Sequence, residues 1–388
     1  MLFYLGIFAI CAIAAIINGK LKNEKEKRIF EISVLLLLCI ISGTRYNLGG
    51  TDYFVYKKAY GAVPMIRDFN FANIQNVDGT FEMEKGYLFL NSLVKTMGLN
   101  FYGFTLIHSM IFYLCMYIGL KRYTKNFNYF LVVFLYKMFF YDTFISMRQS
   151  ISIAIFFIAV QFIEKRKPIK YFALCILAFL FHNSAIILFP LYFINKIKIS
   201  KKTFKIINII GIIFLVLNKQ GIIFLVLNIT GIFVFNPSGI VNKIFSGNQN
   251  AMNKAEGYFD TNEKISIIHT LEYYLIAIII YFNYDSIQNK NEHSNLILNM
   301  FVILMFIFTV MRGFVIITRI KDYFLWTYPI ILYYLIENRK VKEKYLIAIL
   351  SCIVCLYGYT RYINSFDNGG LMPYNSYLND KISIYNEK

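Results

Sequence analysis

The sequence has few acidic residues and lacks the motifs that hold nucleotides or catalytic metals. Of its 388 residues only 22 are Asp or Glu, against 40 Lys or Arg. No Walker loop, HExxH helix or Rossmann glycine fingerprint occurs in it. No acidic cluster is expected on the cytoplasmic side, which argues against nucleotide-sugar chemistry on bound Mg²⁺. We therefore predict no metal site and no cofactor.

Cysteine is also scarce, and the charge is strongly one-sided. All six cysteines lie inside apolar runs, a position typical of small buried hydrophobes rather than of disulfides or a metal site. The net charge of +18 could indicate nucleic acid, but Lys and Arg cluster at the ends of apolar runs instead of along one soluble face. We therefore expect no nucleic-acid partner and interpret the basic clusters as topology signals.

What the sequence does have is apolar residues, which make up 58% of it, with a mean hydropathy of +0.53. Apolar runs of roughly 15 to 24 residues recur from Met1 to Ile363, and each can cross a hydrocarbon core about 30 Å thick. Strand-like alternation is absent, so the runs are expected to be helices. The predicted class is an all-α, polytopic integral membrane protein with about 10–12 transmembrane helices.

Basic clusters set the predicted topology, because loops rich in Lys and Arg stay in the cytoplasm. The first apolar run, at about 2–18, is followed by five basic residues, so the N-terminus is predicted to be extracytoplasmic. The same rule predicts one transmembrane domain at 1–363, extracytoplasmic segments at 45–98 and 236–264, and an extracytoplasmic polar tail at 364–388.

The apolar stretch 171–195 has basic clusters at both ends, so both ends favour the cytoplasm. About 25 residues are too few for two full crossings, and we predict a broken-helix hairpin that turns near Phe181-His182-Asn183-Ser184. Irregular backbone at membrane depth is tolerated where it lines protein or a water-filled cavity, so the turn is a site candidate. A copy of GIIFLVLN at 211–218 recurs at 221–228; we interpret it as replication slippage without function.

Polar residues from distant parts of the chain converge on the outer face under this topology. They are Arg45, Asp52, Glu84, Arg148 with Gln149, His182, Arg312, Arg319 and Asp322. Arginine at outward span ends opposes the usual bias, so it needs an anionic partner. A lipid-linked phosphate fits, because the guanidinium fork binds phosphate oxygens in a bidentate way.

Each of these residues also has a structural interpretation. Arg45 and Asp52 suit an interfacial anchor, Glu84 a charge at a helix start, and Arg148 snorkelling to headgroups. His182 could be satisfied by a backbone carbonyl. A span is predicted at 315–336, where Arg319 and Asp322 could form an ordinary ion pair. Arg312 lies seven residues before Arg319, so the three would share one face if the helix is continuous.

The strings that contain these residues resemble the EpsG-like family of exopolysaccharide polymerases, which are related in role to the Wzy O-antigen polymerases. The matching strings are Arg45 to Tyr56 with Gly50 and Asp52, Glu84 with Gly86, Met147-Arg148-Gln149, Phe181 to Ala185, and Pro373-Tyr374. They occur in the expected order over most of the chain. The resemblance is compatible with a GT-C-like arrangement of the spans.

The resemblance implies a membrane glycosyltransferase that polymerises polyprenyl-diphosphate-linked oligosaccharide repeat units at the outer face of the bacterial cytoplasmic membrane. His182, Asp52 or Glu84 would deprotonate the acceptor hydroxyl, while Arg45, Arg148 and Arg319, with Gln149, Arg312 and Asp322, would bind the diphosphate or the glycan. Membrane lipid, a chain-length regulator and a flippase are the expected partners. The alternatives are a lipid-linked oligosaccharide flippase or other transporter, a polysaccharide ligase, and a membrane O-acyltransferase.

Overall fold

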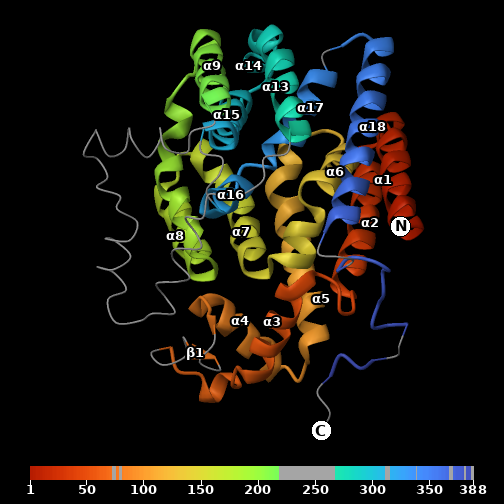
Figure 1. The fold of residues 1–388 in the computed structure, drawn as a ribbon, viewed down its shortest axis with the longest axis vertical. Coiled ribbons are helices and arrows are strands. Elements are labelled where there is room, and N and C mark those ends of the chain that lie inside the picture. Colours follow the sequence, from red (N-terminus) through yellow and green to blue (C-terminus); the bar gives the residue numbers. More distant parts are fainter. Residues whose placement is uncertain are drawn as a thin grey trace. The chain divides into compact units, whose positions relative to one another are not determined.

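Helices form nearly all of the structure, a computed structural model that describes residues 1–71, 76–77, 81–217, 267–310, 315–337, 339–366, 370–379 and 382–385. In those residues the strands are limited to β1 (Asn76–Val77) and β2 (Phe81–Glu82), which pair antiparallel. The predicted all-α class is confirmed (Figure 1). Both copies of the duplicated octapeptide lie wholly or partly outside the described residues, as do the segment 236–264 and Arg312.

Four described helices are long and apolar enough to cross a membrane. They are α1 (Leu2–Lys20), α5 (Phe101–Leu120), α7 (Met147–Glu164) and α18 (Val341–Ser365). Shorter apolar helices accompany them: α6 (Phe127–Lys137), α8 (Pro168–Phe181), α13 (Ile267–Phe282) and α15 (Ser294–Val310). The chain is therefore a polytopic membrane protein, and the number of 10–12 spans stays a prediction.

The chain divides into two compact units, which we call unit 1 (Met1–Phe193 with Ile336–Lys388) and unit 2 (Ile194–Leu335). Besides the helices above, unit 1 contains α2 (Glu24–Gly43), α3 (Gly50–Ala62), η1 (Ile66–Asp68), α4 (Lys85–Thr96), η2 (Lys121–Tyr123), the π-helical η3 (Tyr141–Ile145) and most of η4 (Asn183–Lys196). Unit 2 contains α9 (Lys201–Leu217), α13, α14 (Tyr284–Gln288), α15, α16 (Val315–Asp322) and most of α17 (Thr327–Glu337).

Helix α7 is the centre of unit 1. It packs against α5 on one side and α8 on another, while α2 packs against α5, and α6 packs against α1 and α18. Most α7 side chains are buried, whereas α18 exposes Leu346, Ile349, Leu350 and Ile353 as an apolar face of the kind that lipid covers. The first turn of α7 is therefore held by its neighbours on several sides.

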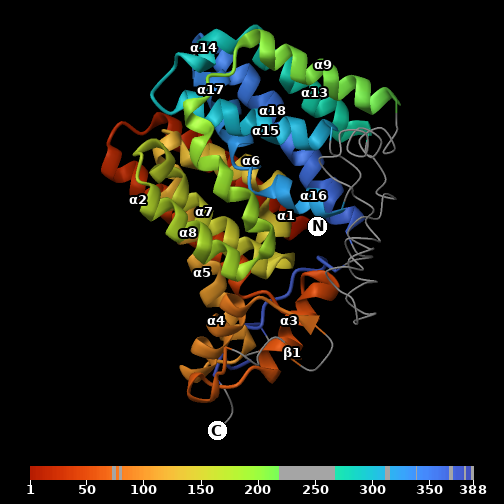
Figure 2. The same ribbon diagram turned by 90° about the vertical axis from the view of Figure 1, so that its left-hand side faces the viewer.

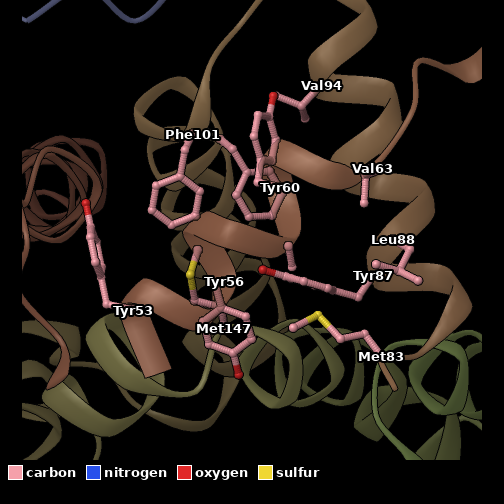
Figure 3. Close-up of a cluster of buried hydrophobic side chains, with 12 residues drawn as sticks. Tyr53, Tyr56, Tyr60, Val63, Met83, Tyr87, Leu88, Val94, Phe101 and Met147 are labelled. Atoms are coloured by element: carbon pink, nitrogen blue, oxygen red, sulfur yellow. The ribbon is translucent and has the colours of Figure 1, made fainter. Parts of the chain in front are cut away.

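An aromatic cluster packs α3 and α4 against the first turns of α5 and α7 (Figure 3). Tyr56 and Tyr87 lie with their ring centroids 5.5 Å apart, and Tyr87 meets Phe104 of α5 edge to face at 5.7 Å. Met147, the first residue of α7, completes the cluster. Figures 1 and 2 both show α3, α4 and β1 gathered at one end of the long helices of unit 1.

The predicted break in 171–195 is confirmed at His182. Helix α8 ends at Phe181, His182 has extended backbone angles of φ −157° and ψ 127°, and η4 begins at Asn183. The chain then folds back on α8, since the Tyr171 hydroxyl donates to the Leu188 carbonyl at 2.6 Å and the rings of Tyr171 and Tyr192 lie 5.5 Å apart. The segment is a hairpin with its turn where the sequence predicted it.

The prediction of one continuous helix over 315–336 is wrong. Helix α16 ends at Asp322, residues 323–326 form turns, and α17 begins at Thr327. The physical reason is Pro329, which has no N–H to donate to Leu325 and whose ring crowds that carbonyl in a continuous helix. Arg319 and Asp322 therefore stand at the end of a short helix, not within a span.

The C-terminal tail is ordered against unit 1 over residues 370–379. Tyr46 N donates to the Asn375 carbonyl at 2.9 Å, and Tyr377 N donates to the Thr44 carbonyl at 3.0 Å. Tyr374, from the Pro373-Tyr374 string, stacks on Phe3 at 4.1 Å and donates to the Ile41 carbonyl at 3.0 Å. The tail therefore joins α1 to the end of α2 and to the loop that leads into α3.

A buried carboxylate fixes the other end of these helices. Glu31 of α2 has no exposed surface and accepts from Lys121 Nζ at 2.6 Å, Asn18 Nδ2 at 2.9 Å, Phe127 N at 3.0 Å and the Tyr117 hydroxyl at 3.1 Å. A buried charge is stable only when it is paired and hydrogen-bonded. Glu31 therefore ties α1, α2, α5 and the start of α6 together.

Replacing Glu31 by Ala should lower the free energy of unfolding by about 3 kcal/mol, because Lys121 and three further donors would lose their partner in a buried setting. Chemical unfolding in detergent, followed by tryptophan fluorescence or circular dichroism, measures this. Glu24→Ala is the matched control, since Glu24 lies on the same helix with its side chain 68% exposed. An equal effect of the two substitutions would contradict the role given to Glu31.

Candidate functional site

The candidate site is built around the Glu84 carboxylate, which contacts two other segments of unit 1. Glu84 Oε2 accepts from Arg148 Nη1 at 2.5 Å. Glu84 Oε1 accepts from the backbone N–H of Asn183 at 3.3 Å. The contacts join the start of α4, the first turn of α7 and the break after α8, three places at which the sequence analysis predicted site residues.

Gly86 explains how Glu84 reaches the break. A Cβ atom at Gly86 would lie 2.7 Å from the Leu180 carbonyl oxygen, inside any real contact distance. The absence of a side chain lets the first turn of α4 approach the last turn of α8 closely. Glu84 lies two residues before Gly86, so this close approach brings the Glu84 carboxylate to the backbone N–H of Asn183.

Arg148 is held on its other side by an aromatic ring. Its guanidinium carbon lies 5.9 Å from the centroid of the Tyr56 ring, within the range of a cation–π contact. The side chain of Arg148 is 20% exposed and that of Glu84 is 10% exposed. Burial raises the pKa of the Tyr56 phenol, although the nearby Arg148 opposes that shift. Tyr56 is thus a neutral phenol beside a partly accessible guanidinium.

His182 is fixed by its own turn. Ser184 N lies 3.3 Å from His182 Nδ1 and the Ser184 hydroxyl oxygen lies 2.6 Å from it. Since a backbone N–H can only donate, Nδ1 is the acceptor, and these contacts assign the proton of the neutral ring to Nε2. The histidine is 6% exposed. It caps the broken backbone next to Asn183, the residue that donates to Glu84.

Arg45 lies inside the protein rather than at its surface. It has no exposed area, and its guanidinium donates to the Ser42 carbonyl at 2.5 Å and the Phe144 carbonyl at 3.4 Å. The guanidinium carbon of Arg45 lies 5.6 Å from the centroid of the Tyr53 ring and 5.3 Å from the centroid of the Phe144 ring. Arg45 thus links the end of α2 to η3, the turn that leads into α7.

Asp52 and Gln149 have opposite surroundings. Asp52 is exposed in the first turn of α3, after Gly49 and Gly50, whose φ angles of 131° and 67° lie in the region that favours glycine. A Cβ at Gly49 would lie 2.3 Å from the Phe144 carbonyl oxygen, so this loop packs directly on η3. Gln149 is 1% exposed, and its Oε1 accepts from the Tyr141 hydroxyl at 3.5 Å.

Within unit 1, the structure brings part of the predicted constellation into contact. Unit 1 contains Arg45, Asp52, Glu84, Arg148, Gln149 and His182, of which Glu84, Arg148 and the His182 turn are in direct contact. Unit 2 contains Arg319, which is half-buried, and Asp322, which is 5% exposed with Oδ1 3.8 Å from Lys321 Nζ. In the described part of the chain, no three His, Cys, Asp or Glu side chains gather as a metal site would require. Cys352 and Cys355, three residues apart on α18, are free thiols like the other four.

The sequence analysis missed His108, which supports the first turn of α7. It is fully buried in α5, with Nε2 3.0 Å from the Met147 carbonyl oxygen and 2.8 Å from Ser150 Oγ. Because a carbonyl only accepts, Nε2 carries the proton and donates. The available signal was a lone ionisable residue within an apolar span, which marks a functional or supporting position.

Arg148→Leu should lower the free energy of unfolding by about 2–3 kcal/mol, because it leaves the Glu84 carboxylate largely buried without its cation. The double variant with Glu84→Gln should recover much of this loss. A double-mutant cycle from unfolding midpoints in detergent measures the coupling. Additive effects of the two substitutions would show that the pair is not coupled.

A comparison with protein families gives a match over nearly the whole chain. The model of the EpsG family matches residues 28–376, from α2 through both units to the ordered tail. No curated protein and no solved structure matches this chain. EpsG is a family of Wzy-type polymerases, so membership indicates a polymerase-like role in polysaccharide synthesis. The chain belongs to the EpsG family.

Proposed function

We propose that this chain is a membrane glycosyltransferase that polymerises polyprenyl-diphosphate-linked oligosaccharide units at the outer face of the bacterial cytoplasmic membrane. The observation that carries the proposal is the Arg148 guanidinium, held between Glu84 and Tyr56 at the start of a central span and left 20% exposed. In an apolar region, an accessible cation at such a place suits an anionic lipid-linked group.

The reaction needs a positive group because the leaving group is a diphosphate. The acceptor hydroxyl oxygen bonds to C1 of the donor sugar, and the C1–O bond to the diphosphate breaks with its electron pair on the phosphate oxygen. Arg148 would neutralise that developing charge, a role worth about 3 kcal/mol per donor in other enzymes. The backbone N–H groups at the start of α7 add to its attraction for phosphate.

Glu84 would act as the resting counter-ion of Arg148. With no substrate bound, its carboxylate offsets the cost of a partly buried guanidinium. A phosphate oxygen competes for the same Nη1–H, so substrate binding would loosen Glu84 from Arg148 while Asn183 still donates to it. The His182 turn would keep Asn183 in place for that exchange.

Two of the three candidates for the base that takes the acceptor proton already accept hydrogen bonds within unit 1. Glu84 already accepts from two donors, and His182 Nδ1 accepts within its own turn. Asp52 is exposed in the first turn of α3, one helical turn before Tyr56. Of the three proposed candidates, Asp52 is the one best placed to meet an acceptor glycan from solution.

Complementation of a deletion strain tests the proposal. Arg148→Gln should abolish surface polymer, and single repeat units on polyprenyl diphosphate should accumulate on the outer leaflet, as seen by gel and by mass spectrometry. The control is Arg122→Gln, because Arg122 contacts Gln161 near the opposite end of α7 through one 3.0 Å hydrogen bond. Accumulation on the cytoplasmic leaflet would instead identify a flippase, and normal polymer would remove Arg148 from the mechanism.

Labelling of Asp52→Cys by a membrane-impermeant maleimide tests the orientation. Position 52 is exposed and lies in the segment predicted outside, so intact cells should be labelled. Glu24→Cys, exposed at the start of α2 and predicted inside, should be labelled only after permeabilisation. The reverse pattern would place the candidate site in the cytoplasm and end the proposal.

A further inference from the structure

Helix α4 has apolar side chains on both of its faces. Tyr87 and Val94 are buried on one face, where they belong to the aromatic cluster. Leu93 and Met97, which are 40% and 62% exposed, lie on the other face with Phe89. These three residues are spaced by four, so they form one stripe along the helix. A helix that is apolar all round normally lies in a protein core or in a membrane.

The segment that precedes α4 extends this stripe. Ile66 N in η1 donates to Thr96 Oγ1 at 2.8 Å, so η1 lies on the last turn of α4. The Phe71 ring stacks on the Phe89 ring at 5.5 Å, and both Ile66 and Phe71 are exposed. An apolar surface patch of this kind marks an interaction site. We call the following residues the α4 patch: Ile66, Phe71, Phe89, Leu93 and Met97.

The depth of α4 in unit 1 indicates what covers the patch. Helix α5 has 20 residues and is therefore about 30 Å long, which is the thickness of the hydrocarbon core. Lys121 follows the end of α5 that is predicted to be cytoplasmic. At the other end, Tyr87 meets Phe104, and Val94 packs in the same cluster as Phe101 (Figure 3). Helix α4 therefore lies beside the outermost turns of a full-length span, at the depth of the outer leaflet.

The contact between α4 and α8 points to the same occupant. Gly86 packs against Leu180 near the end of α8, whose other side exposes Ile176. Gly86, Leu93 and Met97 are spaced by seven and four residues, so they share one face of α4. The face that contacts α8 thus continues as the exposed stripe. Lipid that covers the apolar side of α8 can extend over the α4 patch without a polar interruption.

We propose that α4 is an interfacial helix and that lipid of the outer leaflet covers the α4 patch. With 12 residues α4 is about 18 Å long, which is too short to cross the bilayer. Interfacial helices bury one apolar face roughly 5–10 Å into the boundary between headgroups and acyl chains. The buried face of α4 packs on the protein, and its exposed stripe provides the lipid contact.

An interfacial α4 fixes the depth of the candidate site. Glu84 is the N-cap residue of α4, so a helix held in the leaflet holds Glu84 and its partner Arg148 near the same boundary. A lipid-linked diphosphate lies at that boundary too, and it would reach Arg148 by diffusion within the leaflet. This consequence rests on the proposed function, whereas the position of α4 in the leaflet does not.

Quenching of tryptophan fluorescence by brominated lipids tests the position of α4 and needs no activity. In proteoliposomes, Leu93→Trp should lose most of its fluorescence when the bromine lies near the headgroup end of the acyl chain. It should lose less when the bromine lies near the methyl end, because an interfacial side chain stays high in the leaflet. Trp326 is the single tryptophan of the chain and is fully buried, so wild type in the same lipids gives the signal to subtract.

Two exposed positions serve as matched controls. Leu114→Trp, on the exposed side of α5, should be quenched more strongly by bromine near the methyl end. Glu24→Trp replaces a side chain that is 68% exposed in a charged stretch, and neither lipid should quench it. If Leu93→Trp lowers the unfolding midpoint in detergent, Met97→Trp on the same stripe replaces it as the reporter.

A reporter on α4 that stays unquenched, as at position 24, would overturn the inference. Unquenched emission that is shifted to the blue would identify protein, such as a second copy of the chain, as the occupant and would overturn it as well. Both results would leave the proposed function standing. Loss of the role of Arg148 in polymerisation would instead remove the proposed function and leave α4 in the leaflet.

Discussion

The ion pair between Glu84 and Arg148 is the interaction on which the arrangement of unit 1 depends. It joins the start of α4, the first turn of α7 and the break between α8 and η4. Two charges in an apolar setting are tolerated only in contact, so each fixes where the other can lie. Gly86 permits the close approach of α4 to α8, and the aromatic cluster around Tyr56 and Met147 packs α3 and α4 against α5 and α7.

Arg148 lies in the first turn of α7, and this position determines which charges are favoured beside it. A cation is disfavoured at a helix N-terminus, whereas an anion is favoured there, so Glu84 compensates for an arrangement that would otherwise be unstable. In the proposed function, the diphosphate of the substrate is the second anion that binds at this position. His108 and Arg45 support this position from within by holding the Met147 carbonyl and the Phe144 carbonyl, which belong to the backbone that enters α7.

The sequence predicted the helical membrane class and the break at His182, because apolar length and paired basic clusters act locally. It also placed Glu84 and Arg148 on one face, but not in contact, since that contact depends on the close packing of α4 against α8. The burial of Arg45 could not be predicted, because a charged residue beside aromatic residues also suits an interfacial anchor. The break before Thr327 was missed because Pro329 was not weighed against an apolar pattern that runs through it. His108 was overlooked as a single polar residue in an apolar run, because its partners Met147 and Ser150 lie on a different helix.

Binding of polyprenyl diphosphate to the purified protein tests the central claim most directly. The account predicts that wild type binds the diphosphate lipid more tightly than the monophosphate lipid, and that Arg148→Gln loses this preference while Arg122→Gln keeps it. Equal binding of the diphosphate lipid by wild type and Arg148→Gln would contradict the account, because Arg148 would then have no part in recognising the leaving group.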